Sequence, residues 1–180
     1  ARADGQIYLA ADSQTTPFAT MTSFDRDLAT STNSPMNFTV FSSTMAALLP
    51  SRNMVYAVRM HGTFPSLKVR AIPAQDKPYP TLAEASANQS VYTYNDSTGT
   101  VVGFYTPVFF RGLNVAGYHL HFISEDRKTG GHILDLIVPE NTTVEYDITP
   151  AFTMVLPTSG DFTGVDLSHD LSGDLAKIEQ

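Results

Sequence analysis

The sequence predicts a β-rich α+β fold, with antiparallel or mixed sheets and a few short helices. Most apolar segments are short and rich in β-branched and aromatic residues, turn formers separate them, and few segments carry helix start or stop signals. The 180 residues, 42% of them hydrophobic, are enough for one good-sized core. We therefore expect a single domain over residues 1–180, in which the proline-rich stretch 73–80 either separates two layers or carries the chain around an edge.

The expected strands follow one another along most of the chain. The first begins near the N-terminus, at residues 6–10. Further strands are expected at residues 54–60, 66–72, 100–105, 117–123, 132–138, 143–148 and 152–156. A turn at residues 61–63 should join the second strand to the third, and the turn signal at residues 96–99 should precede the fourth.

Helices are expected at three places. One covers residues 44–49 and ends at Pro50, since proline does not continue a helix. Another begins at Thr81, where Thr81 and Glu84 have the spacing of a capping box. The third is expected within residues 166–178.

Composition and charge exclude several classes of partner. The net charge of −7, with scattered lysines and arginines, argues against binding to nucleic acid, which requires a basic face. No apolar run approaches the ~20 residues of a membrane span. Four N-glycosylation sequons, at Asn37, Asn88, Asn95 and Asn141, are compatible with secretion, and the compartment stays open between the cytoplasm and the exterior.

The most informative segment runs from Gly117 to Ile123 and is followed by Gly130-Gly131-His132. On an extended strand His119 and His121 project from the same face, with Cβ atoms roughly 7 Å apart. If Ile123 pairs with His132 on the returning strand, the third imidazole joins the other two. A pairing shifted by one residue would place His132 on the opposite face.

Three imidazoles match the ligand set of a catalytic zinc site, which keeps a position open for water or substrate. A structural zinc site normally has four ligands, often cysteines, and this chain has no cysteine. Two histidines on one strand can also simply face solvent or form hydrogen bonds. The third histidine, at an offset that a hairpin allows, favours the metal site.

Other charged residues are weaker candidates. Arg70 is expected on the 66–72 strand, with Lys68 on the same face. Arg70 could belong to a solvated cationic edge, or it could bind a substrate carboxylate through both of its terminal nitrogens. We expect the charged loop at residues 125–128, together with His61 and His169, to lie at the surface.

The histidine segment and several others together resemble the α-acetolactate decarboxylase family. The resemblance covers nearly the whole chain in consistent order. The segments that carry it are 49–53, 77–79, 99–104, 117–122, 130–132 and 161–162.

The resemblance implies a zinc enzyme of α+β fold that commonly forms a homodimer and converts 2-acetolactate, a 2-hydroxy-3-keto acid, to acetoin and carbon dioxide. It implies that His119, His121 and His132 bind Zn²⁺, that Arg70 is the active-site arginine, and that Glu179 is a catalytic glutamate. Family members also carry an N-terminal segment that would precede Ala1. We therefore expect this chain to begin part-way through a longer polypeptide.

Two other functions fit parts of the sequence. The spacing of His119, His121 and Glu125 resembles the first metal motif of a cupin, in which Glu125 would be a ligand. A secreted, glycosylated β domain that binds a partner would instead leave the histidines at the surface.

Overall fold

The computed structural model describes residues 1–168 and confirms a β-rich α+β fold with a few short helices. The helices are α1 (Phe38–Leu48) and α2 (Leu82–Ser86), with 3-10 turns η1 (Val108–Phe110) and η2 (Asp161–Gly164). The strands are β1 (Leu28–Ser31), β2 (Met36–Asn37), β3 (Val55–Ala71), β4 (Ser90–Thr106), β5 (Gly117–Ser124), β6 (Gly130–Val138) and β7 (Thr143–Thr149).

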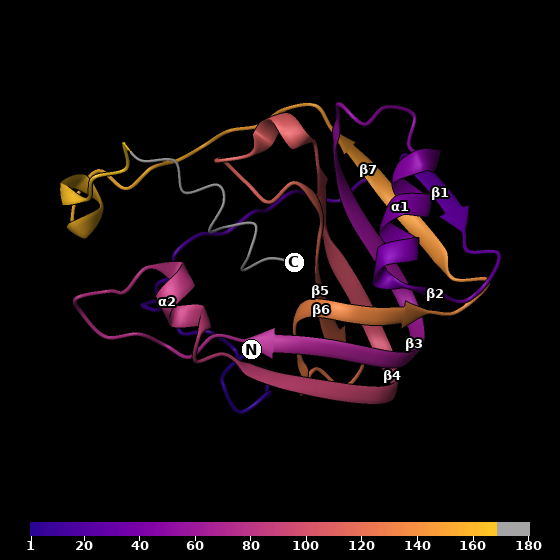
Figure 1. Cartoon of the computed structure of the whole chain (residues 1–180), viewed down its shortest axis with the longest axis horizontal. Helices are drawn as coiled ribbons and strands as arrows, with labels where there is room; N and C mark the ends of the chain where they lie inside the picture. The colour runs from indigo at the N-terminus through magenta and orange to yellow at the C-terminus, as the bar shows by residue number, and fades with distance from the viewer. Residues whose placement is uncertain (169–180) are drawn as a thin grey trace.

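The strands form one sheet in the order β1-β7-β3-β4-β5-β6-β2. Every strand pair is antiparallel among the described residues. An additional pairing between β3 and β6 closes β3, β4, β5 and β6 into a ring. The sheet therefore has an inner and an outer face at this ring, and α1 packs beside it (Figure 1).

The predicted turn at residues 61–63 is wrong. β3 continues through it for 17 residues and pairs with β4 along nearly its whole length, Gly62 facing Gly99. The turn formers instead mark a bend, because Asp96 has a φ of 48° and the facing Pro65 has no N–H to donate to the ladder. Figure 1 shows both strands curving strongly.

Several other expected elements differ from the structure. Residues 6–10 form only an isolated bridge at Gln6, and residues 152–156 have no strand partner among the described residues. α1 begins at Phe38, earlier than expected, because the Asn37 side chain accepts a hydrogen bond from the Val40 N–H and caps the helix. Residues 166–168 are not helical, and the rest of the third expected helix lies outside the described residues.

The remaining predictions of elements are confirmed. Strands cover the expected positions at residues 117–123, 132–138 and 143–148. α2 begins after Thr81 with the full capping box, since the Thr81 and Glu84 side chains each accept from the other residue's backbone. Residues 72–80 connect β3 to α2 without regular structure, and a layer boundary there stays a prediction.

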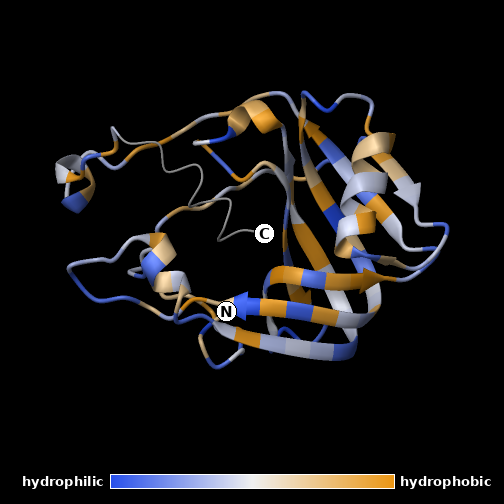
Figure 2. Ribbon diagram, viewed as in Figure 1, coloured by the Kyte–Doolittle hydropathy of each residue, from blue (hydrophilic) through white to orange (hydrophobic). Residues whose placement is uncertain are grey.

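The core fills the inside of the ring and the space under α1. Along β5 buried apolar residues alternate with the two histidines, and Figure 2 shows alternating colours along strands of the ring. Phe41 of α1 contacts the Tyr118 ring of β5, with centroids 5.6 Å apart. The most deeply buried side chains include Tyr56, Phe41, Phe64, Met45, Met60, Leu67, Leu120, Ile133 and Leu136.

None of the helices within residues 1–168 has the length and apolar content that a bilayer crossing requires.

Candidate metal site

The histidine cluster lies on the outer face of the ring, opposite the core. On β5 the side chains of Tyr118, Leu120 and Phe122 are buried in the core. Since neighbouring residues of a strand point to opposite faces, His119 and His121 project outward. On β6, Ile133 belongs to the core and the adjacent His132 projects to the same outer side as the other two histidines.

The register that unites the histidines differs from the expected one. His121 faces His132 directly, and Ile123 faces Gly130. The expected pairing of Ile123 with His132 was therefore wrong by two residues. An even shift preserves the face of every side chain, so the three imidazoles still meet.

The three rings converge on one point. His119 Nε2 lies 3.1 Å from His121 Nε2 and 3.1 Å from His132 Nδ1. The ligand atoms of all three lie within 4.8 Å of one another, so the group could hold a metal ion. An imidazole nitrogen has either one N–H or one lone pair in the ring plane, so His119 Nε2 can form a normal hydrogen bond with only one of its two neighbours at a time.

A cation between the rings would engage a lone pair from each. Two nitrogens bound to a tetrahedral zinc ion at ~2.0–2.1 Å would be about 3.3 Å apart. The observed spacing of 3.1 Å between His119 Nε2 and each neighbour is close to that value. The residues present therefore fit a metal ion with three nitrogen ligands.

The surroundings of His121 and His132 favour the neutral form of both rings. Withdrawal of the ring from water, followed by the nearby Arg70 charge and the other two histidines, lowers the pKa of His132 to about 2. Desolvation and the neighbouring His119 lower the pKa of His121 to about 4, although this ring is the most accessible of the three. Neutral imidazole is the form that binds a metal, so the site needs no deprotonation step near neutral pH.

Arg70 lies beside the histidine cluster. It faces His132 in the β3–β6 pairing and is 4% exposed, whereas Lys68 is exposed. Arg70 is thus not part of a solvated cationic edge. Its Nη1 donates a hydrogen bond to Gln89 Oε1 at 3.1 Å, from the residue before β4.

Gly131 permits this contact between β6 and β3. A Cβ atom at Gly131 would lie 2.6 Å from the Arg70 carbonyl oxygen and 3.3 Å from Val69 Cβ. Any other residue would push β6 away from β3 at this position. The small size of Gly131 therefore allows the strands to bring His132 next to Arg70.

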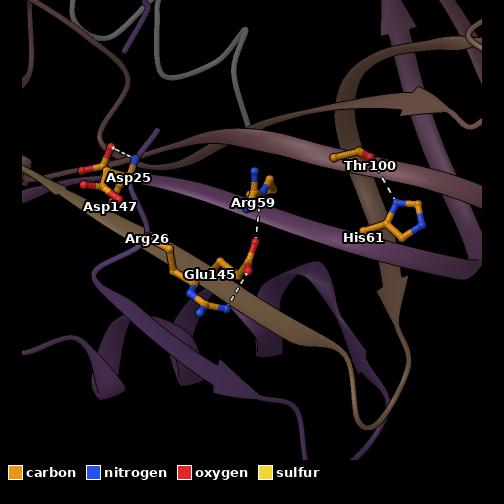
Figure 3. A network of polar contacts seen from close by, with 7 residues as sticks. All are labelled: Asp25, Arg26, Arg59, His61, Thr100, Glu145 and Asp147. Carbon is orange, nitrogen blue, oxygen red and sulfur yellow. Dashed lines mark hydrogen bonds and ion pairs between the residues drawn. The ribbon is translucent and has the colours of Figure 1, made fainter. Parts of the chain in front are cut away.

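A second polar network lies on the same outer face, in the same row of paired residues as His121. His121 faces Val102 of β4, which faces Arg59 of β3, which faces Glu145 of β7. Arg59 Nε donates to Glu145 Oε2 at 2.7 Å, and Arg26 Nη1 contacts Glu145 Oε1 at 3.3 Å (Figure 3). The hydrogen bond from Arg59 is the largest cause of a lowered Glu145 pKa.

This network fastens the segment before β1 to the sheet. The Asp25 N–H donates to Asp147 Oδ2 at 3.1 Å, and Arg59 also stacks over the Phe24 ring, 4.4 Å from its centroid. Residues 24–26 therefore border the histidine face on the β7 side.

Glu125, a candidate ligand that the structure describes, is not part of the histidine cluster. Glu125 is exposed and its Oε2 is 3.7 Å from His61 Nε2, in a shallow surface hollow. Among the described residues, the group that could hold a metal contains the three histidines without Glu125. A cupin-type site is thus not favoured. Glu179 and His169 lie outside the described residues.

Sequence reasoning missed Gln89. It is separated from Arg70 by 19 residues, and no motif links the two. The only available signal was the capping box of α2, which predicts where the helix begins and so brings Gln89 close to the start of the next strand.

Known proteins are similar to this chain in sequence and in fold. The family model described as alpha-acetolactate decarboxylase matches residues 1–169. The α-acetolactate decarboxylase of Methanosarcina mazei is 44% identical over 179 residues, which cover 99% of this chain and 62% of the relative. That of Bacillus licheniformis is 37% identical over 179 residues, which cover 99% of this chain and 70% of the relative.

A crystal structure of α-acetolactate decarboxylase from Bacillus subtilis strain 168 superposes with a TM-score of 0.93 at 34% sequence identity, over 99% of this chain and 76% of the other. The chain thus spans less than two thirds of the Methanosarcina relative and about three quarters of the solved Bacillus chain.

Proposed function

The chain belongs to the α-acetolactate decarboxylase family, and on that premise we propose that it decarboxylates 2-acetolactate to acetoin and carbon dioxide with a zinc ion bound by His119, His121 and His132. The observation that carries the proposal is the convergence of three imidazoles beside a buried arginine. Family membership makes the cupin and the glycosylated binding module unfavoured alternatives.

The reaction breaks the bond between the carboxylate carbon and the carbon that bears the hydroxyl. The electron pair moves onto the neighbouring ketone, and the resulting enediolate takes up a proton at carbon to give acetoin. A bound zinc ion would supply Lewis acidity where this negative charge develops, which is worth several kcal/mol.

The chain's own residues have separate tasks in this scheme. The three histidines hold the metal ion, and the lowered pKa values of His121 and His132 keep these two rings available as ligands. Arg70, next to His132, binds and orients the substrate carboxylate through its guanidinium. Glu179 is proposed as the acid that delivers the proton to one side of the enediolate.

Replacement of a ligand tests the metal site. His121→Ala should lose both bound zinc and acetoin formation, because two imidazoles do not hold a catalytic zinc ion tightly. Elemental analysis and an acetoin assay on the purified protein measure the two effects. A variant that keeps activity without metal would contradict the scheme.

Replacement of the arginine separates substrate binding from metal binding. Arg70→Ala should lower kcat/KM by about a hundredfold or more, since a charge-assisted contact to the substrate is lost, while the zinc content stays at the wild-type level. If zinc is lost with the guanidinium, Arg70 supports the metal site rather than the substrate.

Chelation tests the dependence on metal without a mutation. Treatment with a chelator should abolish acetoin formation, and added zinc should restore it. We also propose that the protein forms a homodimer, so that light scattering would give about twice the chain mass of 19.6 kDa. A monomer in solution would refute this second proposal and leave the first one standing.

A further inference from the structure

We propose that Gln89 is a positioning residue for the substrate: its neutral amide holds the Arg70 guanidinium in place and lets it bind the carboxylate of an anionic 2-hydroxy-3-keto acid. This inference rests on the proposed function. It adds a residue to the site that neither the sequence motifs nor the family resemblance indicated.

The contact itself is direct. Arg70 Nη1 donates to Gln89 Oε1 at 3.1 Å, and Arg70 is 4% exposed. A guanidinium carries its N–H groups in one rigid plane, so a fixed acceptor on one terminal nitrogen limits the rotation of the whole group. The Gln89 amide therefore helps to set the plane in which the guanidinium can meet a carboxylate.

Gln89 is well placed to serve as a fixed acceptor, because regular structure holds its backbone on both sides. On one side its N–H donates to the Ser86 carbonyl at 3.1 Å, directly after α2. The capping box at Thr81 fixes the start of that helix. On the other side Ser90 opens β4 and pairs with Ala71, the residue after Arg70.

The chemistry of the acceptor matters as much as its position. An amide oxygen accepts a hydrogen bond without a formal charge, so this contact does not neutralise the guanidinium. A glutamate in the same place would form an ion pair with Arg70 and compete with the substrate carboxylate. An amide at position 89 therefore does not itself compete with a substrate carboxylate for the Arg70 charge.

Two substitutions separate position from charge. Gln89→Met keeps the length of the side chain and removes the acceptor, and Gln89→Glu keeps the acceptor and adds a negative charge. Gln75→Met is the matched control, because the half-buried Gln75 amide donates to the Pro73 carbonyl at 2.8 Å, a contact in which Arg70 takes no part. Zinc content is measured for every variant.

Binding is measured by calorimetry with two probes. One is 2,3-dihydroxy-2-methylbutanoate, which keeps the carboxylate and lacks the ketone that decarboxylation requires. The other is acetoin, which has no carboxylate. Steady-state kinetics with 2-acetolactate give kcat and KM for the same variants.

We expect Gln89→Met to lower kcat/KM on the order of tenfold, and Gln89→Glu to weaken binding of the carboxylate probe on the order of tenfold or more. Acetoin binding and zinc content should change less than twofold, and the Gln75 control should behave as wild type. The inference is overturned if both Gln89 variants match the wild type, or if they weaken acetoin and the carboxylate probe equally, which indicates a general structural defect.

Failure of the proposed function would look different. A wild-type protein that binds the carboxylate probe and forms no acetoin would contradict the decarboxylase proposal, while the comparison of probe binding still tests Gln89. A wild-type protein that binds neither probe would overturn both.

Discussion

At the scale of single residues, the fold keeps His121 and His132 neutral at pH values below 6.5, where the unfolded chain would protonate them. The ordinary histidine pKa is about 6.5. Burial and the Arg70 charge lower the pKa of His132 to about 2, and desolvation lowers that of His121 to about 4. Below pH 6.5 the unfolded state therefore binds more protons than the folded state. The free energy of unfolding must then decrease as the pH is lowered.

The pH dependence can be measured on metal-free protein. We expect the free energy of unfolding to drop by roughly 1–2 kcal/mol between pH 7 and pH 5, chiefly through the buried His132. Urea denaturation at several pH values gives the slope. His132→Asn should flatten it and His61→Asn, at an exposed ring, should not. A metal-free protein equally stable at both pH values would contradict this prediction. It would mean that these histidines take up protons in the folded state as readily as in the unfolded state.

Glu125 provides a test at a residue that the sequence offered as a ligand. Its carboxylate lies near His61 and is exposed, so Glu125→Gln should leave zinc content and acetoin formation within about twofold of wild type. Elemental analysis and the acetoin assay check this. Loss of metal in this variant would restore the cupin interpretation.

At the scale of elements, the site depends on how closely β6 approaches β3. A Cβ at Gly131 would meet the Arg70 carbonyl oxygen at 2.6 Å, and this overlap involves backbone that cannot rotate away. We expect Gly131→Ala to lower the free energy of unfolding by about 1–3 kcal/mol and to reduce kcat/KM, because Arg70 and His132 move apart.

The matched control for Gly131 is Gly62→Ala. Gly62 lies in β3 of the same sheet and has nothing within 4 Å of an added Cβ, so the substitution should change stability by less than about 0.5 kcal/mol. Chemical denaturation and the acetoin assay compare the two variants. A Gly131 variant as stable and active as the control would show that the ring tolerates a wider spacing at this point.

Helices and strands could be predicted from the sequence where a local pattern of residues determines them. The capping box at Thr81 and the alternation in β5 are local, and both predictions were confirmed. The turns predicted near Gly62 and Gly99 are wrong. Two long strands bend together there, and the pairing between them outweighs the local preference for a turn. The strand predicted at residues 152–156 is wrong for the opposite reason. Its apolar pattern favours a strand locally, but no strand among the described residues pairs with it.

At the scale of the whole molecule, the hydrophobic core and the candidate metal site lie on opposite faces of the same strands. The core fills the inner face under α1, and the histidines lie outside. Phe41→Ala should therefore lower the free energy of unfolding by about 3–4 kcal/mol, because Phe41 is fully buried against Tyr118, and leave zinc content unchanged in the folded protein. Denaturation and elemental analysis measure both. Loss of metal from a folded Phe41 variant would mean that the two faces are coupled.

The sequence alone determined the strand period, and with it the shared face of His119 and His121 and the candidate role of His132. Two-residue periodicity is a property of any extended chain, so a register wrong by an even number still gave the right set of residues. Only the tertiary structure decided that Arg70 is buried against His132 and held by Gln89. Those contacts depend on the closure of the ring between β3 and β6, which joins residues far apart in the chain through backbone pairing that no local pattern encodes.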